Sequence, residues 1–316
     1  MMARLLAAEI ERGGPMRFSR FMETSLYHPE HGYYRRDRFG RRGDFYTAGQ
    51  LQPVFGLLIA ERIRALWREM GSPAEFEVVE PGAGRREMAP FFEGWRYTPV
   101  EAGEAFPRRI RGVVFSNEFF DALPVDVYVF REGAWREMRV ETKGSRFVWI
   151  ENGPPGPEAA EYLERNVPGP GEGRIAETPL AALEWMDRIA GALEAGFVLT
   201  IDYGYTRAEA VRFPAGTLMS YRRHTAREAV LETPGEQDIT AHVPFTALEE
   251  RGAARGLRTV RFETLARTLM EGGEEGFNTA LDAPTAGEQE RRRLQLKTLL
   301  FGMGETFRVL IQRKDA

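Results

Sequence analysis

Cysteine is absent from this chain of 316 residues, so neither a disulfide bond nor a thiolate nucleophile can take part in its structure or chemistry. Lysine is nearly absent too: Lys143, Lys297 and Lys314 are the only three, and arginine carries almost all of the positive charge. The four histidines show no spacing with acids that is typical of metal ligands. We therefore expect no metal site.

Long apolar runs are also missing. The longest such run in the early chain, residues 54–60, is far shorter than the about 20 apolar residues that a membrane-spanning helix needs. Residues 1–20 contain several charged side chains and lack the apolar core of a secretory signal peptide. These absences predict a soluble, cytoplasmic protein with no membrane insertion.

A clustered excess of positive charge is lacking as well. The formal net charge is −4 and the isoelectric point is near 5.8, whereas binding to phosphates requires a basic surface. Short arginine runs at 35–36, 41–42 and 291–293 are expected to lie on solvated faces. Nucleic acid is therefore not an expected partner, and the chain is long enough to bury a large core.

Apolar segments alternate with segments of helical periodicity along most of the chain. Helices are expected at residues 2–12, 18–22, 53–70, 180–195 and 245–256, and strands at 76–80, before 101, and at 112–116, 196–205, 257–262 and 307–311. This alternation predicts an α/β fold with a parallel, doubly wound sheet. Between residues 125 and 150 a period of two predicts an antiparallel insertion, and the Pro- and Gly-rich stretch 153–173 predicts a loop.

A glycine turn follows the first of these strands. The strand ends in Glu80, a position where methyltransferases commonly carry an acid, and Gly82 and Gly84 provide a sharp bend where a nucleotide-like cofactor can approach the main chain. A nicotinamide fingerprint would require Gly or Ala at position 87, which is Glu87 here. The alternative is an ordinary strand-to-helix turn. Only a short segment separates Gly84 from Glu101, which leaves little room for a full helix.

Glu101 ends the second expected strand. A carboxylate at this position can accept hydrogen bonds from both ribose hydroxyls of a nucleoside. The alternative is that Glu101 is a plain solvent-facing acid.

An amide and two carboxylates follow the next strand: Asn117, Glu118 and Asp121. Methyl transfer is an in-line displacement, so the protein mainly aligns the nucleophile with the methyl group and excludes water. Carboxylates can bind a guanidinium bidentately and hold a nitrogen lone pair toward that methyl group. We expect these three residues nearest the reacting atoms of an S-adenosylmethionine-dependent methyltransferase. The alternative for Asp121 is the cap of a helix.

Four further residues are weaker candidates. Asp44 and Thr47 lie on a loop before the helix at 53–70, where they can fold over a cofactor or serve as a turn and an N-cap. Asp202 ends a core strand and can face the same cleft. His242 is a lone histidine, a residue that is more often structural than catalytic.

Several motifs occur together in an order typical of one family, and the chain resembles the MidA-type methyltransferases from about residue 17 to Ile311. The run from Asn117 to Val125 is the most specific of them. The others are Gly32-Tyr33-Tyr34, Gly43-Asp44-Phe45-x-Thr47, Glu80-x-Gly82-x-Gly84-Arg85, Asp202-Tyr203-Gly204 and Asp238-Ile239-Thr240-Ala241-His242-Val243-x-Phe245.

The resemblance implies a class I methyltransferase fold with a Rossmann-like doubly wound sheet and S-adenosyl-L-methionine as cofactor. Mitochondrial members of the family are assembly factors for respiratory complex I that symmetrically dimethylate an arginine on one of its core subunits. We expect an N-terminal helical and loop extension, 1–52, that closes over the cofactor. The methyltransferase domain is expected at 53–316, with an antiparallel insertion at about 125–175 and a helical cap at about 263–300.

The resemblance also implies roles for individual residues. Catalytic roles fall to Glu118, Asp121 and Asn117, and substrate binding to Asp202 and His242. Cofactor binding falls to a larger set: Glu80, Gly82, Gly84, Glu101, Asp44, Thr47 and Asn117. Three positions depart from the family pattern: Arg86 stands where Gly is usual, Ala83 where Pro is frequent, and Gln50 where Glu is common.

The expected function is methylation of an arginine on a partner protein, such as a respiratory complex I subunit. Two alternatives remain open at this point: a small-molecule O- or N-methyltransferase, and an assembly chaperone without turnover. A homodimer is compatible with the sequence.

Overall fold

A computed structural model of the chain describes residues 1–35, 51–167, 169–222 and 225–316. The chain forms two compact units, and each is assembled from three separate segments. Unit 1 consists of Met1–Tyr46, Phe120–Glu184 and Tyr205–Ala247. Unit 2 consists of Thr47–Phe119, Trp185–Gly204 and Leu248–Ala316.

The sheet of unit 2 carries the strands that the alternating pattern predicted. In spatial order they are β14 (Arg258–Thr264), β15 (Phe307–Lys314), β9 (Leu193–Tyr205), β4 (Ile110–Asn117), β2 (Glu77–Pro81) and β3 (Arg96–Val100). The pairs β2–β3, β2–β4 and β4–β9 are parallel, so their carboxyl ends meet at one edge of the sheet. The α/β fold class is therefore confirmed.

The expectation of a parallel, doubly wound sheet is wrong at one strand. β15 pairs antiparallel with both β9 and β14, which makes the sheet mixed. A buried strand has the same apolar pattern in either direction, so the composition of residues 307–314 could not fix its orientation.

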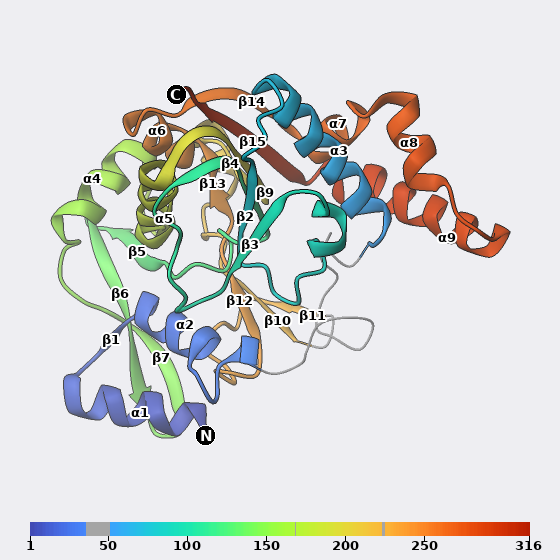
Figure 1. Cartoon of the computed structure of the whole chain (residues 1–316). Coiled ribbons are helices and arrows are strands. Elements are labelled where there is room, and N and C mark those ends of the chain that lie inside the picture. Colours follow the sequence, from blue (N-terminus) through green and yellow to red (C-terminus); the bar gives the residue numbers. More distant parts are fainter. Residues whose placement is uncertain (36–50, 168, 223–224) are drawn as a thin grey trace. The chain divides into compact units, whose positions relative to one another are not determined.

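Helices and sheet of unit 2 pack together and form one apolar core. α3 (Val54–Glu69) buries Leu58, Ile59, Ile63 and Leu66 and lies beside α8 (Gly273–Leu281) and α9 (Ala286–Lys297), as Figure 1 shows. The remaining helical elements are α7 (Leu265–Met270), the π-helix η5 (Thr298–Met303) and the 3-10 helix η3 (Ala89–Phe92). Between Gly84 and Glu101 only η3 forms, as the short segment predicted.

Unit 1 contains two antiparallel sheets. The first has the order β1 (Met16–Arg17), β6 (Ala134–Lys143), β5 (Asp126–Arg131) and β8 (Ile175–Thr178), with β7 (Arg146–Glu151) also paired to β6. The second joins β11 (Thr225–Arg227), β10 (Met219–Arg222) and β12 (Asp238–Thr240). The period-two segments between residues 125 and 150 are thus antiparallel strands.

Two helices at the start of the chain pack on the first sheet. α1 (Met2–Gly13) and α2 (Phe18–Tyr27) contact β6, and their apolar faces join one hydrophobic core with strand residues such as Val127 and Val140. The described residues also form η1 (Tyr33–Arg35), α4 (Pro157–Asn166), η4 (Arg207–Arg212), α5 (Leu180–Ala192), α6 (Phe245–Ala254) and the short strand β13 (Val243–Pro244).

Two expected boundaries need correction. The stretch 153–173 is not all loop, because α4 begins at Pro157 and buries Ala159 and Leu163. Proline suits the first helical position, where its missing N–H has no intrahelical partner to lose. The helix expected at 180–195 ends at Ala192, and β9 begins at once with Leu193, which pairs with Ile110 of β4.

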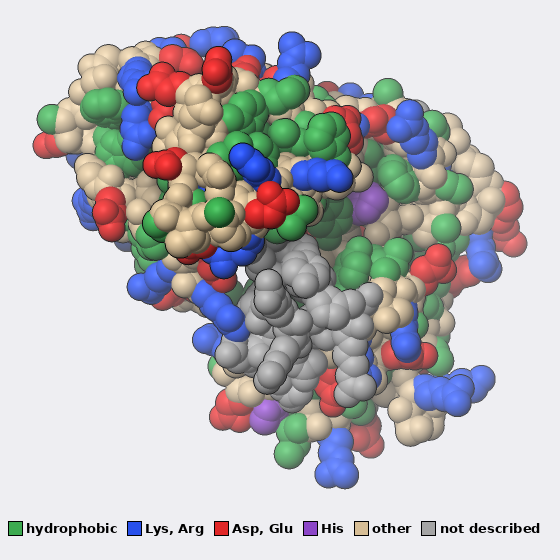
Figure 2. Space-filling view, turned by 90° about the vertical axis from the view of Figure 1, so that its right-hand side faces the viewer, with side chains coloured by type: hydrophobic (Ala, Val, Ile, Leu, Met, Phe, Trp, Pro, Cys, Tyr) green, Lys and Arg blue, Asp and Glu red, His purple; other side chains and the backbone are tan. Residues whose placement is uncertain are grey.

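Charge on the surface is mixed. On the face in Figure 2, arginine and lysine side chains are interspersed with acidic ones. α9, which contains the run Arg291 to Arg293, buries none of its residues, as expected for a solvated face. Among the described residues, no helix is long and apolar enough to span a membrane.

Candidate active site

The glycine turn of unit 2 requires glycine for two separate reasons. Gly82 and Gly84 have φ angles of 72° and 56°, in the left-handed region that side chains disfavour. A Cβ atom on Gly82 would lie 2.8 Å from Cδ2 of Phe119, whereas one on Gly84 would meet nothing closer than 4.0 Å. The Gly82 N–H donates to the Val100 carbonyl (2.9 Å), which fixes the turn against the end of β3. The turn is therefore held by the neighbouring strand, packed against Phe119 at Gly82 and open to a ligand at Gly84.

Glu80, at the end of β2, is a buried carboxyl group with a phenol partner. It is 5% exposed, and its Oε2 accepts a hydrogen bond from the Tyr97 hydroxyl (2.5 Å) on β3. Burial raises the pKa of Glu80 to about 8, although the Tyr97 bond opposes the shift. A ligand that brings positive charge near Glu80 would favour its ionised form. Tyr97 was missed in the sequence, because pairing between parallel strands cannot be deduced from either strand alone.

Glu101 lies against the same turn. Its Oε1 accepts from the Gly84 N–H (2.6 Å), and its own N–H donates to Glu104 Oε2 (2.8 Å). The structure thus brings Glu80, Gly82, Gly84 and Glu101 together at the carboxyl ends of β2 and β3. Glu101 is bound to the turn and is not a plain solvent-facing acid.

Arg86, where the family pattern has glycine, retains the backbone conformation of glycine. Its φ angle is 60°, and its side chain is exposed. An arginine in this region carries a conformational cost of about 1 kcal/mol.

Glu118 follows β4 in a strained conformation. Its φ angle is 51°, which is uncommon for a residue other than glycine, asparagine or aspartate. Its N–H donates to the Ile201 carbonyl (3.0 Å) of β9, and its Oε1 accepts from Asn117 Nδ2 (3.2 Å). The Asn117 Oδ1 atom is buried and has no hydrogen-bond partner among the described residues. Strained residues and orphaned acceptors concentrate at ligand sites.

Asp202 is brought next to this pair by strand register. Asn117 of β4 lies opposite Ile201 of β9, so Asp202 follows at the adjacent strand end. Asp202 is fully buried, and its Oδ1 accepts from the Tyr203 N–H (2.9 Å). Unit 2 therefore places Asn117 and Glu118 at the end of β4 beside Asp202, which lies three residues before the end of β9.

Asp121 and His242 belong to unit 1. Asp121 is 4% exposed and lies in a turn at which no helix begins, so it does not cap a helix. Its carbonyl accepts from the Ala241 N–H (2.9 Å). The His242 N–H donates to Thr217 Oγ1 (3.1 Å), and burial lowers the pKa of the imidazole, which favours its neutral form. Asp44, Thr47 and Gln50 lie outside the described residues.

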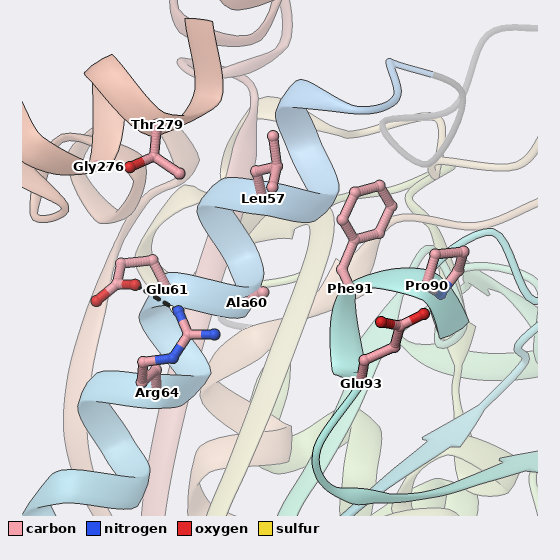
Figure 3. Close-up of a pocket in the computed structure, with 9 residues that line it drawn as sticks. All are labelled: Leu57, Ala60, Glu61, Arg64, Pro90, Phe91, Glu93, Gly276 and Thr279. Carbon is pink, nitrogen blue, oxygen red and sulfur yellow. Dashed lines mark hydrogen bonds and ion pairs between the residues drawn. The ribbon is translucent and has the colours of Figure 1, made fainter. Parts of the chain in front are cut away.

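One pocket of unit 2 lies away from these strand ends. It is lined by α3, by the η3 region and by α8, and Figure 3 shows the Arg64–Glu61 ion pair (2.6 Å) on its wall. None of the candidate residues at the strand ends lines it. Within the part of the chain that the structure describes, no group of three or more acidic or histidine side chains could hold a metal ion.

Residues at the strand ends of unit 2 fit an S-adenosylmethionine-like ligand. The glycine turn supplies main chain without Cβ atoms, open at Gly84. The buried Glu80 of β2, Glu101 after β3 and the unpartnered Asn117 Oδ1 supply several acceptors for hydroxyl and ammonium groups.

Comparisons with known proteins agree with this geometry. A family model of S-adenosyl-L-methionine-dependent methyltransferases matches residues 93–263. A Burkholderia thailandensis protein crystallised with S-adenosyl-homocysteine superposes with a TM-score of 0.89 at 28% identity, over 99% of this chain and 92% of that one. The Drosophila melanogaster protein arginine methyltransferase NDUFAF7 homolog is 28% identical, over 81% of this chain and 70% of its own length. The human protein arginine methyltransferase NDUFAF7 is 24% identical, over 97% and 82%.

The names of these curated relatives correct one expectation. They are mitochondrial proteins, which contradicts the cytoplasmic location predicted from the sequence. The prediction was based on the lack of an apolar secretory core. Mitochondrial transit peptides are amphipathic and rich in arginine, so that test says nothing about them.

The family model covers more than half of the chain. The matching Burkholderia thailandensis crystal structure contains S-adenosyl-homocysteine, which is what S-adenosylmethionine becomes after it has donated its methyl group. The chain therefore belongs to this family of S-adenosyl-L-methionine-dependent methyltransferases, in agreement with its MidA-type motifs, and its cofactor is S-adenosyl-L-methionine.

Proposed function

We propose that the chain is a protein arginine N-methyltransferase whose acceptor lies on a partner protein, such as a respiratory complex I subunit. The observation that carries the proposal is the strained Glu118, held beside Asn117 at the end of β4, the strand that pairs with β2 and its glycine turn. The names of the curated relatives support arginine as the acceptor.

Residues of unit 2 would hold the cofactor. S-adenosylmethionine supplies an electrophilic methyl group on a sulfonium centre. Gly82 and Gly84 would let the main chain approach it, Glu101 would accept from the ribose hydroxyls, and Glu80 and Asn117 would meet its methionine end. We also assign cofactor binding to Asp44 and Thr47 of the proposed extension 1–52. We take 53–316 as the methyltransferase domain, with insertions at about 125–175 and 263–300.

Glu118 would act on the acceptor. Its carboxylate can accept N–H bonds from a guanidinium and turn one nitrogen lone pair toward the methyl carbon. The new N–C bond forms as the S–C bond breaks with its electrons passing to sulfur, and the nitrogen then loses a proton. We assign a second acceptor contact to Asp121, and substrate contacts to Asp202 and to the neutral His242.

A matched pair of variants tests the role of Glu118. Glu118→Gln keeps the shape of the side chain but removes its charge, so methyl transfer should fall by about a hundredfold or more while S-adenosylhomocysteine affinity stays within about threefold. Glu132→Gln is the control, because Glu132 also has a positive φ angle (52°) but lies in the β5–β6 turn. Transfer is measured as tritium incorporated from labelled S-adenosylmethionine into protein.

The same assay separates the rival functions. Parent-rate transfer by Glu118→Gln would refute the catalytic role. Label that appears only in small molecules would identify a small-molecule acceptor. A parent protein that binds partners but neither binds S-adenosylhomocysteine nor transfers label would be an assembly chaperone.

A further inference from the structure

Unit 1 contains a buried carboxylate–tyrosine pair that the expected site does not include. Asp238 begins β12 and is only 1% exposed. Its Oδ1 accepts from the Tyr34 hydroxyl (2.9 Å) and from the Ile239 N–H (3.0 Å). Tyr34 belongs to η1, about 200 residues earlier in the chain, so the fold joins two distant segments at this carboxylate.

Aromatic rings surround the pair. The rings of Tyr27 and Tyr34 lie 5.4 Å apart, and the Tyr27 hydroxyl donates to the Ala122 carbonyl (2.9 Å). Tyr221 of β10 is the register partner of Asp238, so the two side chains share one face of the short sheet. Asp238 is therefore flanked by aromatic residues from α2, η1 and β10.

The charge of Asp121 also affects the pKa of the Tyr34 hydroxyl. Burial and the nearby charges of Asp238 and Asp121, together with Tyr27, raise the pKa of Tyr34 well above its usual value. Tyr34 thus stays protonated and remains a hydrogen-bond donor. The Ala241 N–H bonded to the Asp121 carbonyl holds the Asp121 turn beside the end of β12.

Thr240 supplies an independent sign of a missing ligand. It is 4% exposed, and its Oγ1 has no hydrogen-bond partner among the described residues. Side chains two apart on a strand point to the same face, so Thr240 and Asp238 share a face of β12. A buried hydroxyl without a partner costs stability unless a ligand satisfies it.

We infer that this cluster, defined as Tyr34, Asp121, Asp238 and Thr240, recognises the guanidinium group of an arginine side chain on the protein substrate; the inference rests on the proposed function. A guanidinium is a planar cation with five N–H donors, and it suits carboxylates, a hydroxyl acceptor and aromatic faces at once. An ammonium group is compact, strongly hydrated and lacks this fork, so the cluster discriminates between arginine and lysine.

Titration of the full chain, saturated with S-adenosylhomocysteine, tests the assignment. The probe is ethylguanidinium, ethylammonium is the matched cation, and binding is followed by ligand-observed NMR. The parent should bind ethylguanidinium about tenfold more tightly than ethylammonium. Asp238→Asn should lower that affinity about tenfold. Thr240→Val, which removes an unsatisfied hydroxyl and so folds at least as stably as the parent, should lower it about threefold.

Glu232→Gln is the control for charge, because it removes one negative charge from an exposed position in the same unit. It should leave the affinity unchanged. Unchanged affinity in both Asp238→Asn and Thr240→Val would overturn the site, and equal binding of the two cations by the parent would overturn the guanidinium assignment.

The labelled residue in hydrolysed methylation product reports on the proposed function separately. Label on arginine together with unaffected variants would mean that arginine is the acceptor and is recognised elsewhere. Label on any other residue would refute arginine methylation itself.

Discussion

Each unit contains a buried carboxyl group bonded to a tyrosine hydroxyl, and the two pairs differ in their further support. Glu80 in unit 2 is bonded by Tyr97 from the neighbouring strand (2.5 Å), and burial still raises its pKa to about 8. Asp238 in unit 1 is bonded by Tyr34 (2.9 Å) and also by the N–H of the next residue, Ile239. A backbone N–H donated to a carboxylate favours its charged form, whereas a single phenol does not offset burial. The pairs are therefore suited to different tasks.

The largest expected effect that separates the pairs is the dependence of stability on pH. Glu80 has a pKa of about 8 in the folded protein and 4.5 ordinarily, so the folded state binds a proton that the unfolded state has released between these values. The contribution of Glu80 to the free energy of unfolding is fully present below pH 4.5 and is lost as the pH rises through 8. Between pH 6 and 8 the loss should be on the order of 3 kcal/mol.

Glu80→Gln should abolish that decline, and urea unfolding at several pH values measures it. The exposed Glu69→Gln serves as the control and should follow the parent. A parent curve that is flat from pH 6 to 8 would mean that Glu80 is ionised throughout and that the comparison of the two pairs fails.

Removing the hydroxyl groups gives the next largest effect. Tyr97→Phe leaves a buried carboxyl group without its phenol donor and should cost about 1–3 kcal/mol. Tyr34→Phe should cost about 0.5–1.5 kcal/mol, because Asp238 keeps the Ile239 N–H. Unfolding in urea at pH 7 compares the two directly. Equal losses, or a larger loss in Tyr34→Phe, would show that the backbone donor does not support Asp238.

A pair of glycine variants sharpens the comparison within unit 2. Gly82→Ala meets Phe119 at 2.8 Å and also suffers a positive φ, whereas Gly84→Ala suffers only the φ penalty. We expect destabilisation of about 2–3 kcal/mol for the first and about 1 kcal/mol for the second. Thermal unfolding gives the order, and a reversed order would mean that Phe119 moves aside freely.

Much of the unit 2 site could be predicted from the sequence. Glycines and acids at strand ends are adjacent in the chain to the strands that position them, so the placement of Glu80, Gly82, Glu101 and Glu118 at these ends could be predicted without a structure. The partners of these residues were not, because Tyr97 reaches Glu80 only through the register of two parallel strands. The strained φ of Glu118 is set by its bond to Ile201, a residue more than 80 positions away.

Unit 1 was harder to predict for the same reason. Asp238 and Tyr34 are brought together by chain segments that the sequence separates widely, and Thr240 gives no local sign that it lacks a partner. The orientation of β15 was likewise beyond reach, since the buried apolar run at its centre has the same pattern in either direction.

The alternation of the chain between its two units has a consequence for biogenesis. β15, which lies between β9 and β14, is made after the other strands of the unit 2 sheet, and unit 1 is completed only at Ala247. Early segments of both units must therefore keep apolar faces exposed until their later partners have been synthesised. Contacts of long sequence separation also slow folding. Such a chain should depend on chaperones during synthesis. Because each unit is assembled from three separate segments, no single cut in the chain can release either unit as one continuous piece.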